Sequence, residues 1–189
     1  MRMTTVYGLR QDDAYQALVQ VDSDGEVAYD TSIAIRATAL CGRAFGEEYK
    51  PVELSWGSPR RKKSSDIHTL LSPFLVFSKK SFDALSPLLR GAGEVLPVET
   101  PADDMLGFHV TRALEGAVDM EKSKYKVYPQ ATIFNKIVLL EHQVRDIDIF
   151  RLKESPATVF VSEKFKGLVE ESKLKGFDFG EVVSISSES

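Results

Sequence analysis

The stretch from Ile149 to Val183 constrains the fold more than any other, because it reads as one complete strand–helix–strand unit. Thr158–Val161 is a β-branched and aromatic run that predicts a buried strand, and Ser162 then offers a side-chain oxygen that can cap a helix. The predicted helix has one apolar face, formed by Phe165, Leu168 and Val169. Gly176 favours the left-handed conformation that ends a helix, and Phe177–Phe179 restarts a period-two strand pattern.

An earlier stretch is built in the same way and predicts a second unit of this kind. Phe74–Phe77 is an apolar run, Ser78 is a capping residue, and Val95–Val98 follows the glycines Gly91 and Gly93. The apolar face of the helix has the members Phe82, Leu85 and Leu89. The first two stand 83 residues before their counterparts in the later helix, although the two capping serines are 84 residues apart. The units are either an internal duplication or two instances of a pattern that is common in α+β proteins.

Pro87 interrupts the helix predicted for this earlier unit. Inside a helix a proline removes one hydrogen bond and costs roughly 3 kcal/mol. The sequence therefore allows two arrangements. In one, a single helix is kinked at Pro87; in the other, Ser86 caps a second short helix that has Pro87 at its first position.

The remaining signals complete an α+β protein with antiparallel or mixed sheets and a few short helices. Residues 4–30 alternate as antiparallel strands around a hairpin turn at Asp24–Gly25. Further strands are predicted at Pro51–Trp56, Gly107–Ala113 and Ile133–Glu141. For Ser32–Leu40 the alternation of Ile33 and Ile35 leads us to predict a strand, although the alanine content favours a helix. We divide the chain into a β-rich region over residues 1–65 and a second region over residues 66–189, packed as one compact unit or as two close halves.

Three motifs of the second region carry a resemblance to a known family. They are SKKSFDALSPLLRGAGEVLPVE from Ser78 to Glu99, DMEKS from Asp119 to Ser123, and the C-terminal segments DIFRLKES and VFVSEKFKGLVEESKLKGFDF. With these motifs, residues 66–183 resemble the immunity proteins of bacterial polymorphic-toxin systems, a family formerly described as a domain of unknown function. Lys79 and Lys80 depart from the family pattern, which has an acidic and a basic residue after the capping serine.

The resemblance implies an antidote that binds a cognate protein toxin, commonly a nuclease or another cytotoxic enzyme, and blocks it without catalysis or a cofactor. It also marks residues 66–189 as the immunity-protein-like region. The shared motifs consist of caps, core aromatics and turn glycines, so they indicate the family better than they indicate a site.

Composition narrows the cellular setting and excludes several kinds of site. The chain of 189 residues is 43% hydrophobic and 28% charged, as ordinary globular proteins are. It has no run of 18 or more apolar residues and no signal-peptide core near its first residue, so we expect a cytoplasmic protein without a membrane partner. Cys41 is the single cysteine and the three histidines are scattered, so no disulfide or metal site is predicted. The net charge of −4 argues against general nucleic-acid binding.

The candidates for contact with a partner are an aromatic and basic group at the loop Gly57–Asp66 and three pairs of carboxylates. The first group comprises Trp56, Arg60 and Arg61; the carboxylates are Asp12, Asp13, Glu47, Glu48, Asp103 and Asp104. Tryptophan and arginine often anchor interfaces, and carboxylates complement a basic toxin surface. Each candidate also has a plainer interpretation, in which the tryptophan belongs to the core and the charges only solvate the surface.

Two other functions are compatible with the sequence. The chain has no glycine-rich phosphate loop, Gly-x-Ser-x-Gly or His-Glu-x-x-His motif, but carboxylate enzymes need no local motif. A hydrolase would bring Asp119 and His109 together in one pocket. In the structural interpretation, Asp119 belongs to a turn and His109 is an ordinary residue of a strand. The third hypothesis is an adaptor that binds another protein without neutralising it.

Overall fold

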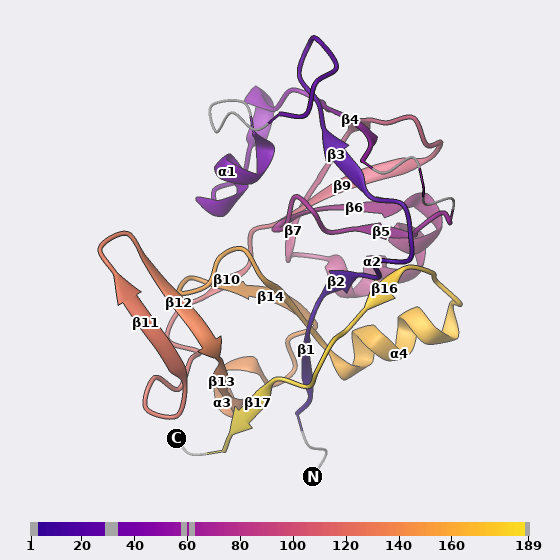
Figure 1. Ribbon diagram of the computed structural model, residues 1–189. Helices are drawn as coiled ribbons and strands as arrows, with labels where there is room; N and C mark the ends of the chain where they lie inside the picture. The colour runs from indigo at the N-terminus through magenta and orange to yellow at the C-terminus, as the bar shows by residue number, and fades with distance from the viewer. Residues whose placement is uncertain (1–3, 29–33, 58–59, 61–62, 188–189) are drawn as a thin grey trace.

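The computed structural model describes residues 4–28, 34–57, 60 and 63–187 (Figure 1). These residues form short helices and strands in several small sheets, of which some are antiparallel and some are mixed or parallel. The predicted α+β class is therefore confirmed. Two four-stranded sheets form the centre of the molecule, and two helices pack against a core that both sheets share.

The first central sheet is antiparallel throughout and has the strand order β5-β6-β9-β7. Its strands are β5 (Ile67–His68), β6 (Phe74–Ser78), β9 (Met105–Val110) and β7 (Gly93–Leu96). Side chains of β6 alternate between two cores: Leu75 and Phe77 face one, and Phe74 and Val76 face the other. Because both faces of this strand are covered, its sequence is a continuous apolar run.

The second central sheet is mixed and has the order β1-β15-β14-β10. Its strands are β1 (Val6–Gly8), β15 (Val159–Ser162), β14 (Ile149–Leu152) and β10 (Ala113–Leu114). The chain passes directly from β9 of the first sheet to β10 of the second. Val159 and Val161 face the shared core, whereas Phe160 faces a separate core on the other side.

Helices α2 (Lys79–Leu89) and α4 (Glu163–Glu171) leave the ends of β6 and β15 and pack against each other. Leu85 and Leu89 of α2 are fully buried in the shared core, as are Phe165 and Val169 of α4. The apolar helix faces predicted from the sequence are therefore confirmed. Each fully buried side chain of this size contributes roughly 1.5–3 kcal/mol, so this core contributes a large share of the stability of the fold.

The two strand–helix units share a detailed arrangement at the start of each helix. Ser78 accepts a hydrogen bond from the Ser81 amide at 3.1 Å, and Ser162 accepts one from the Phe165 amide at 3.1 Å, so both predicted caps are confirmed. Each serine hydroxyl also donates to an aspartate that precedes the neighbouring strand. Asp66 accepts from Ser78 at 2.7 Å, and Asp148 accepts from Ser162 at 2.8 Å.

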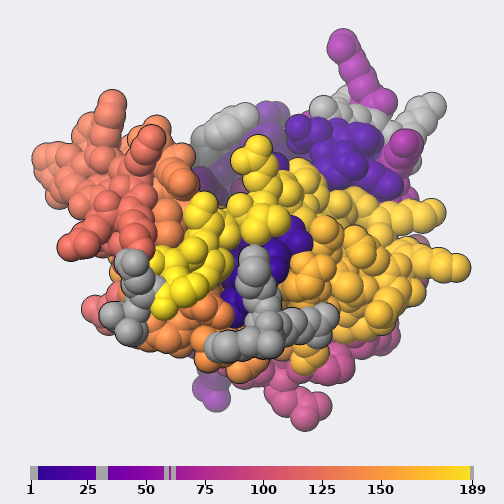
Figure 2. Space-filling model, turned by 90° about the horizontal axis from the view of Figure 1, so that it is seen from below, coloured from indigo at the N-terminus to yellow at the C-terminus, as the bar shows by residue number. Residues whose placement is uncertain are grey.

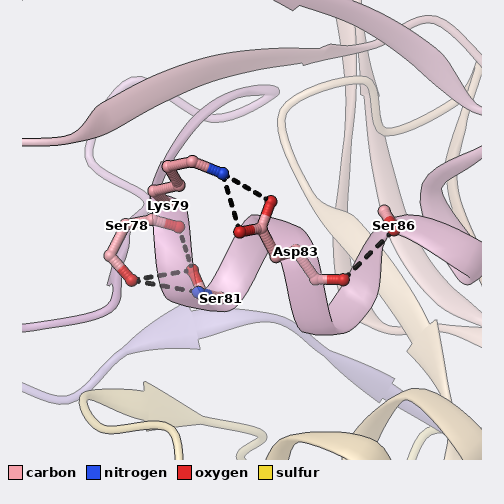
Figure 3. A network of polar contacts seen from close by, with 5 residues as sticks. All are labelled: Ser78, Lys79, Ser81, Asp83 and Ser86. Atoms are coloured by element: carbon pink, nitrogen blue, oxygen red, sulfur yellow. Dashed lines mark hydrogen bonds and ion pairs between the residues drawn. The ribbon is translucent and has the colours of Figure 1, made fainter.

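Helix α2 continues through Pro87 as one element, so Ser86 does not start a second helix. The proline has no N–H to donate to the carbonyl of Asp83 one turn earlier. The Ser86 hydroxyl donates to that carbonyl oxygen instead, at 3.1 Å (Figure 3). This side-chain bond compensates part of the cost of a proline within the helix.

A third sheet and a short helix cover the outer face of the first sheet. The sheet contains β3 (Leu18–Gln20), β4 (Val52–Trp56) and β8 (Val98–Glu99), and the other elements are α1 (Ile35–Leu40) and the 3-10 turn η1 (Gly46–Glu48). The strand predicted over residues 32–40 is wrong for its described part, which is α1. Ile35 and Ala39 lie one helical turn apart and are both buried, so the alanine-rich sequence follows helical spacing.

Smaller two-stranded sheets complete the fold. They are β2 (Arg10–Gln11) with β16 (Phe177–Asp178), β13 (Val138–Leu140) with β17 (Ser184–Ser186), and β11 (Lys124–Tyr128) with β12 (Ala131–Lys136). The single strand predicted over 133–141 is wrong, because the chain changes partner at Ile137 between β12 and β13. Glu141 then starts the short helix α3 (Glu141–Val144).

The antiparallel strands predicted over residues 4–30 exist, but they pair with distant strands. The predicted turn at Asp24–Gly25 is confirmed by the positive φ of Gly25 and by a bridge between Val21 and Val27. Residues 29–30 lie outside the described part of the chain. Within that part, no helix is long and apolar enough to span a membrane.

Candidate partner-binding surface

The β11–β12 hairpin carries the densest group of exposed apolar side chains in the described part of the chain. The exposed fractions are 72% for Val127, 55% for Ile133, 48% for Tyr128 and 37% for Tyr125. Single exposed apolar residues are ordinary, but a group of them often marks an interaction site. The hairpin stands out from the body in Figure 1, and in Figure 2 its residues form the coral lobe at the left.

The hairpin forms because two alternating segments flank a two-residue turn, Pro129–Gln130. Tyr125 lies opposite Phe134, with ring centroids 5.6 Å apart, and such cross-strand aromatic pairs stabilise a two-stranded sheet. Phe134 also packs against the core that contains Leu139 and Phe150. The base of the hairpin is thus held by the body, while β11 is exposed along its whole length.

Charge on the hairpin differs in sign from that of the remaining chain. Lys124, Lys126 and Lys136 are exposed, and no carboxylate of the described residues lies within ion-pair distance of them. None of the chain's 28 acidic residues falls between positions 124 and 136. The remainder therefore has 21 basic and 28 acidic residues, a formal charge of −7, against +3 on the hairpin.

Sequence reasoning did not single out this hairpin as a site. The useful signal was the pair of segments KYKVY and ATIFNK around Pro-Gln, with lysines alternating with apolar residues. The apolar run that follows conceals it, because that run predicts one continuous strand over Ile133–Glu141. Only the change of partner at Ile137 separates the exposed strand from the buried one.

The acidic candidates lie in three separate loops. Asp12 and Asp13 line a small cavity of about 110 Å³, where Asp12 accepts a hydrogen bond from the Ala14 amide at 2.8 Å and so stabilises its own turn. Asp103 and Asp104 are exposed in the turn before β9, and the Asp104 carbonyl accepts from the Lys79 amide at 2.7 Å. Their role in a partner interface stays a prediction.

Glu47 and Glu48 are exposed in η1, and Glu48 lines a cavity of about 760 Å³ between η1 and α1. The neighbouring Phe45 ring contacts Phe74, which pairs with His109 at the far end of β9 from Asp104. The two pairs of carboxylates thus lie at opposite ends of the β6–β9 ladder. They do not form one continuous acidic patch with each other.

The aromatic and basic candidates also separate. Trp56 ends β4 half-buried, packs against the core around Leu54, and has its ring centroid 6.3 Å from that of His68. It supports the core at the edge of the loop. Arg60 is exposed, and Arg61 lies outside the described residues.

The two residues of the hydrolase hypothesis are not brought together. His109 is completely buried, and its Nε2 atom lies 3.2 Å from the carbonyl oxygen of Ala39. Burial lowers the pKa of His109, which favours the neutral ring. Asp119 lies in a turn, where its carboxylate accepts from the Lys122 amide at 3.1 Å. None of the cavities identified in the described part of the chain is lined by both residues.

The buried polar groups beside His109 connect elements of the fold. Arg151 is almost fully buried and donates from Nη1 to the carbonyl oxygen of Ala39 at 3.0 Å. Glu94 accepts from the Phe45 amide at 2.9 Å and lies 3.9 Å from the His109 ring. These contacts fasten the end of α1 and the loop after it to both central sheets.

The fold and its surface define a small α+β protein whose best-formed candidate site is an exposed hairpin. Comparison with protein families finds that residues 42–184 match the model of the Imm11 immunity protein family. The chain therefore belongs to this immunity protein family, and the family resemblance seen in the sequence is confirmed. A comparison with curated proteins finds no similar sequence.

Proposed function

We propose that this protein is an antidote that binds a cognate bacterial toxin domain in the cytoplasm and neutralises it without catalysis. The observation that carries the proposal is the match of residues 42–184 to an immunity protein family. The exposed apolar and basic hairpin supports it, because an inhibitor that acts by binding needs such a surface. The separation of His109 from Asp119 gives no support to the hydrolase alternative.

Neutralisation by binding sets requirements on the interface. A stable complex of this kind buries about 1,200–2,000 Å² in total, and a few aromatic or basic anchors supply most of the affinity. A single free toxin molecule turns over many substrates, so the antidote must dissociate slowly. Nuclease–immunity pairs approach the limit of non-covalent affinity, as the known colicin pairs illustrate.

The experiment is a growth-rescue assay. Each toxic protein domain encoded beside this gene in its source genome is expressed under an inducible promoter, with and without this chain. We expect one toxin to arrest growth alone and to be tolerated when the chain is present. Failure to rescue from every such toxin would contradict the proposal.

A second measurement separates binding from catalysis and from an adaptor role. Purified chain is titrated into a fixed amount of the rescued toxin while the activity of the toxin is followed. An antidote that acts by binding gives a linear loss of activity that ends at a fixed molar ratio. Complete inactivation by far less than one equivalent would indicate an enzyme, and binding without loss of activity would indicate an adaptor.

A further inference from the structure

Within the part of the chain that the structure describes, the outer face of the β11–β12 hairpin is left exposed, and its chemistry suggests what covers it. We propose that this face docks onto an acidic surface of the cognate toxin, with apolar side chains at the centre and lysines around them. The inference rests on the proposed function and names the element that performs it. It differs from the expectation that carboxylates of this chain meet a basic toxin.

The register of the hairpin places the relevant side chains on one face. Lys126 lies directly opposite Ile133, and Tyr128, two residues further along the same strand, lies opposite Ala131. Side chains opposite one another, or two apart on one strand, point to the same side of a sheet. Lys126, Tyr128 and Ile133 therefore share the outer face. The other face carries Phe134, which packs on the body of the protein.

This face has the composition of an interface centre. Tyr128 and Ile133 expose about half of their surface and have apolar area to lose on binding. Tyrosine adds a hydroxyl that donates or accepts, and it loses little conformational entropy when it becomes fixed. Because Phe134 anchors the hairpin from behind, the outer face is largely formed before a partner arrives, which reduces the entropic cost of docking.

Charge identifies the chemistry of the partner. The three hairpin lysines are not neutralised by any described carboxylate, and the remaining chain is strongly acidic. An acidic toxin surface is attracted to the hairpin and repelled by most of the remaining molecule, so charge directs the partner to this element. The attraction acts over about 8 Å at physiological ionic strength.

Two simpler explanations account for less of the surface. Lysines on exposed strands prevent unwanted pairing with other strands, which explains Lys124 and Lys126. It does not explain Ile133, because an exposed β-branched residue favours such pairing. A single-stranded nucleic acid would use the lysines and tyrosines, but this aliphatic side chain adds little to base stacking. A protein surface uses both groups.

The test compares two doubly substituted chains of equal net charge. The hairpin variant is Lys126→Glu with Ile133→Thr. The control is Lys50→Glu with Val95→Thr, which changes an exposed lysine before β4 and an exposed valine on β7. Threonine keeps the β-branched shape that strands favour, so neither variant should lose its fold. Thermal unfolding of both variants checks this.

The probe is a catalytically inactive form of the toxin domain found by growth rescue, titrated calorimetrically at low and at physiological salt. We expect the Kd of the hairpin variant to rise at least about 30-fold, and that of the control by less than about threefold. The effect of Lys126→Glu alone should shrink as salt rises. This single variant decides the matter if the double variant is unstable.

The outcomes separate the inference from the proposed function. If the unmodified chain rescues growth but both variants bind like it, the hairpin inference is wrong and the antidote function stands. If the unmodified chain rescues growth from no toxin, both the hairpin inference and the proposed antidote function are wrong. Two results would show that the face binds something other than the toxin and would overturn the inference. One is a self-associated form that only the hairpin variant disrupts, and the other is hairpin-dependent binding of a fluorescent oligonucleotide.

Discussion

At the scale of single residues, Asp66 makes hydrogen bonds that join separate parts of the fold. One carboxylate oxygen accepts from the Ser78 hydroxyl at 2.7 Å, and the other accepts from the Lys175 amide at 2.7 Å. Its carbonyl oxygen accepts from the Ser81 hydroxyl. It therefore joins the start of α2 to the segment that follows α4.

Replacing Asp66 with alanine should lower the free energy of unfolding by about 2–3 kcal/mol. The change leaves the Lys175 amide without its partner and weakens the cap of α2. Urea denaturation measures the effect, with Asp83→Ala as the control. Asp83 forms an exposed ion pair with Lys79, so its loss should cost no more than about 0.5 kcal/mol (Figure 3). Equal effects of the two substitutions would refute the role assigned to Asp66.

His68 gives the protein a predictable response to acid. Its side chain is buried, and neither ring nitrogen has a hydrogen-bond partner among the described residues. Burial lowers the pKa of His68 to about 4, against the opposing influence of the Asp66 carboxylate. In the unfolded chain a histidine binds its proton near pH 6.5.

As the pH falls, His68 therefore binds a proton in the unfolded state before it does so in the folded state. The stability that the neutral ring contributes is complete above about pH 6.5 and is lost as the pH falls towards 4, by up to about 1.4 kcal/mol per pH unit. His68→Leu should remove this dependence. The free energy of unfolding of the variant should therefore rise relative to that of the unmodified protein as the pH falls from 6.5 to 4. Parallel urea stability curves for the two proteins over this range would contradict the assignment.

At the scale of elements, two glycines in regular structure should respond in opposite directions to alanine. A Cβ atom at Gly93 in β7 would overlap the backbone carbonyl of His109 in the paired strand β9. The strands would have to separate, which should cost about 3 kcal/mol or more. Gly167 lies inside α4, and nothing lies within 4 Å of the position of its Cβ.

Gly167→Ala should therefore stabilise the protein by about 0.5–1 kcal/mol, because alanine loses less backbone entropy in a helix. Both variants are compared with the unmodified chain by urea denaturation monitored by circular dichroism. A stabilising Gly93→Ala, or a destabilising Gly167→Ala, would show that local packing differs from that described.

The elements that could be predicted from sequence were those specified by neighbouring residues. Ser78 and Ser162 fix the starts of two helices through local geometry, so these caps and the apolar helix faces followed from spacing alone. The helix end predicted at Gly176 is wrong: Gly176 has a positive φ, but α4 ends at Glu171 and Lys173 takes the left-handed conformation there. Strand partners could not be predicted, because pairing joins residues such as Val6 and Ser162 that are far apart in the chain. The hairpin was missed for the same reason: its exposure depends on what covers each strand, and no local pattern states that.

At the scale of the whole molecule, residues before position 42 complete a sheet and a buried polar cluster whose other members lie in residues 42–184, the segment that matches the family. β1 forms the edge of the second central sheet, where it pairs with β15. Helix α1 brings the Ala39 carbonyl to two buried groups, the Arg151 guanidinium and the His109 ring. The separation into regions 1–65 and 66–189 stays a prediction, and these contacts favour one compact unit.

A chain shortened to residues 42–189 should therefore fail to unfold cooperatively. It would lose the buried side chains of Val6, Leu18 and Ile35, and it would leave the buried Arg151 without the Ala39 carbonyl. Removing one partner of a buried charged group costs about 1.5–3 kcal/mol, before the lost apolar burial is added. Near-ultraviolet circular dichroism during urea denaturation gives the measurement.

Adding the missing piece in trans provides the control. Co-expression with a separate peptide of residues 1–41 should restore a cooperative transition, because the same pairings can form between two chains. A shortened chain with the full transition would show that residues 42–189 fold independently, and the N-terminal strands would then be an addition to a complete domain. The two results assign opposite roles to β1, since in one it is required for the second sheet to form and in the other it only covers its edge.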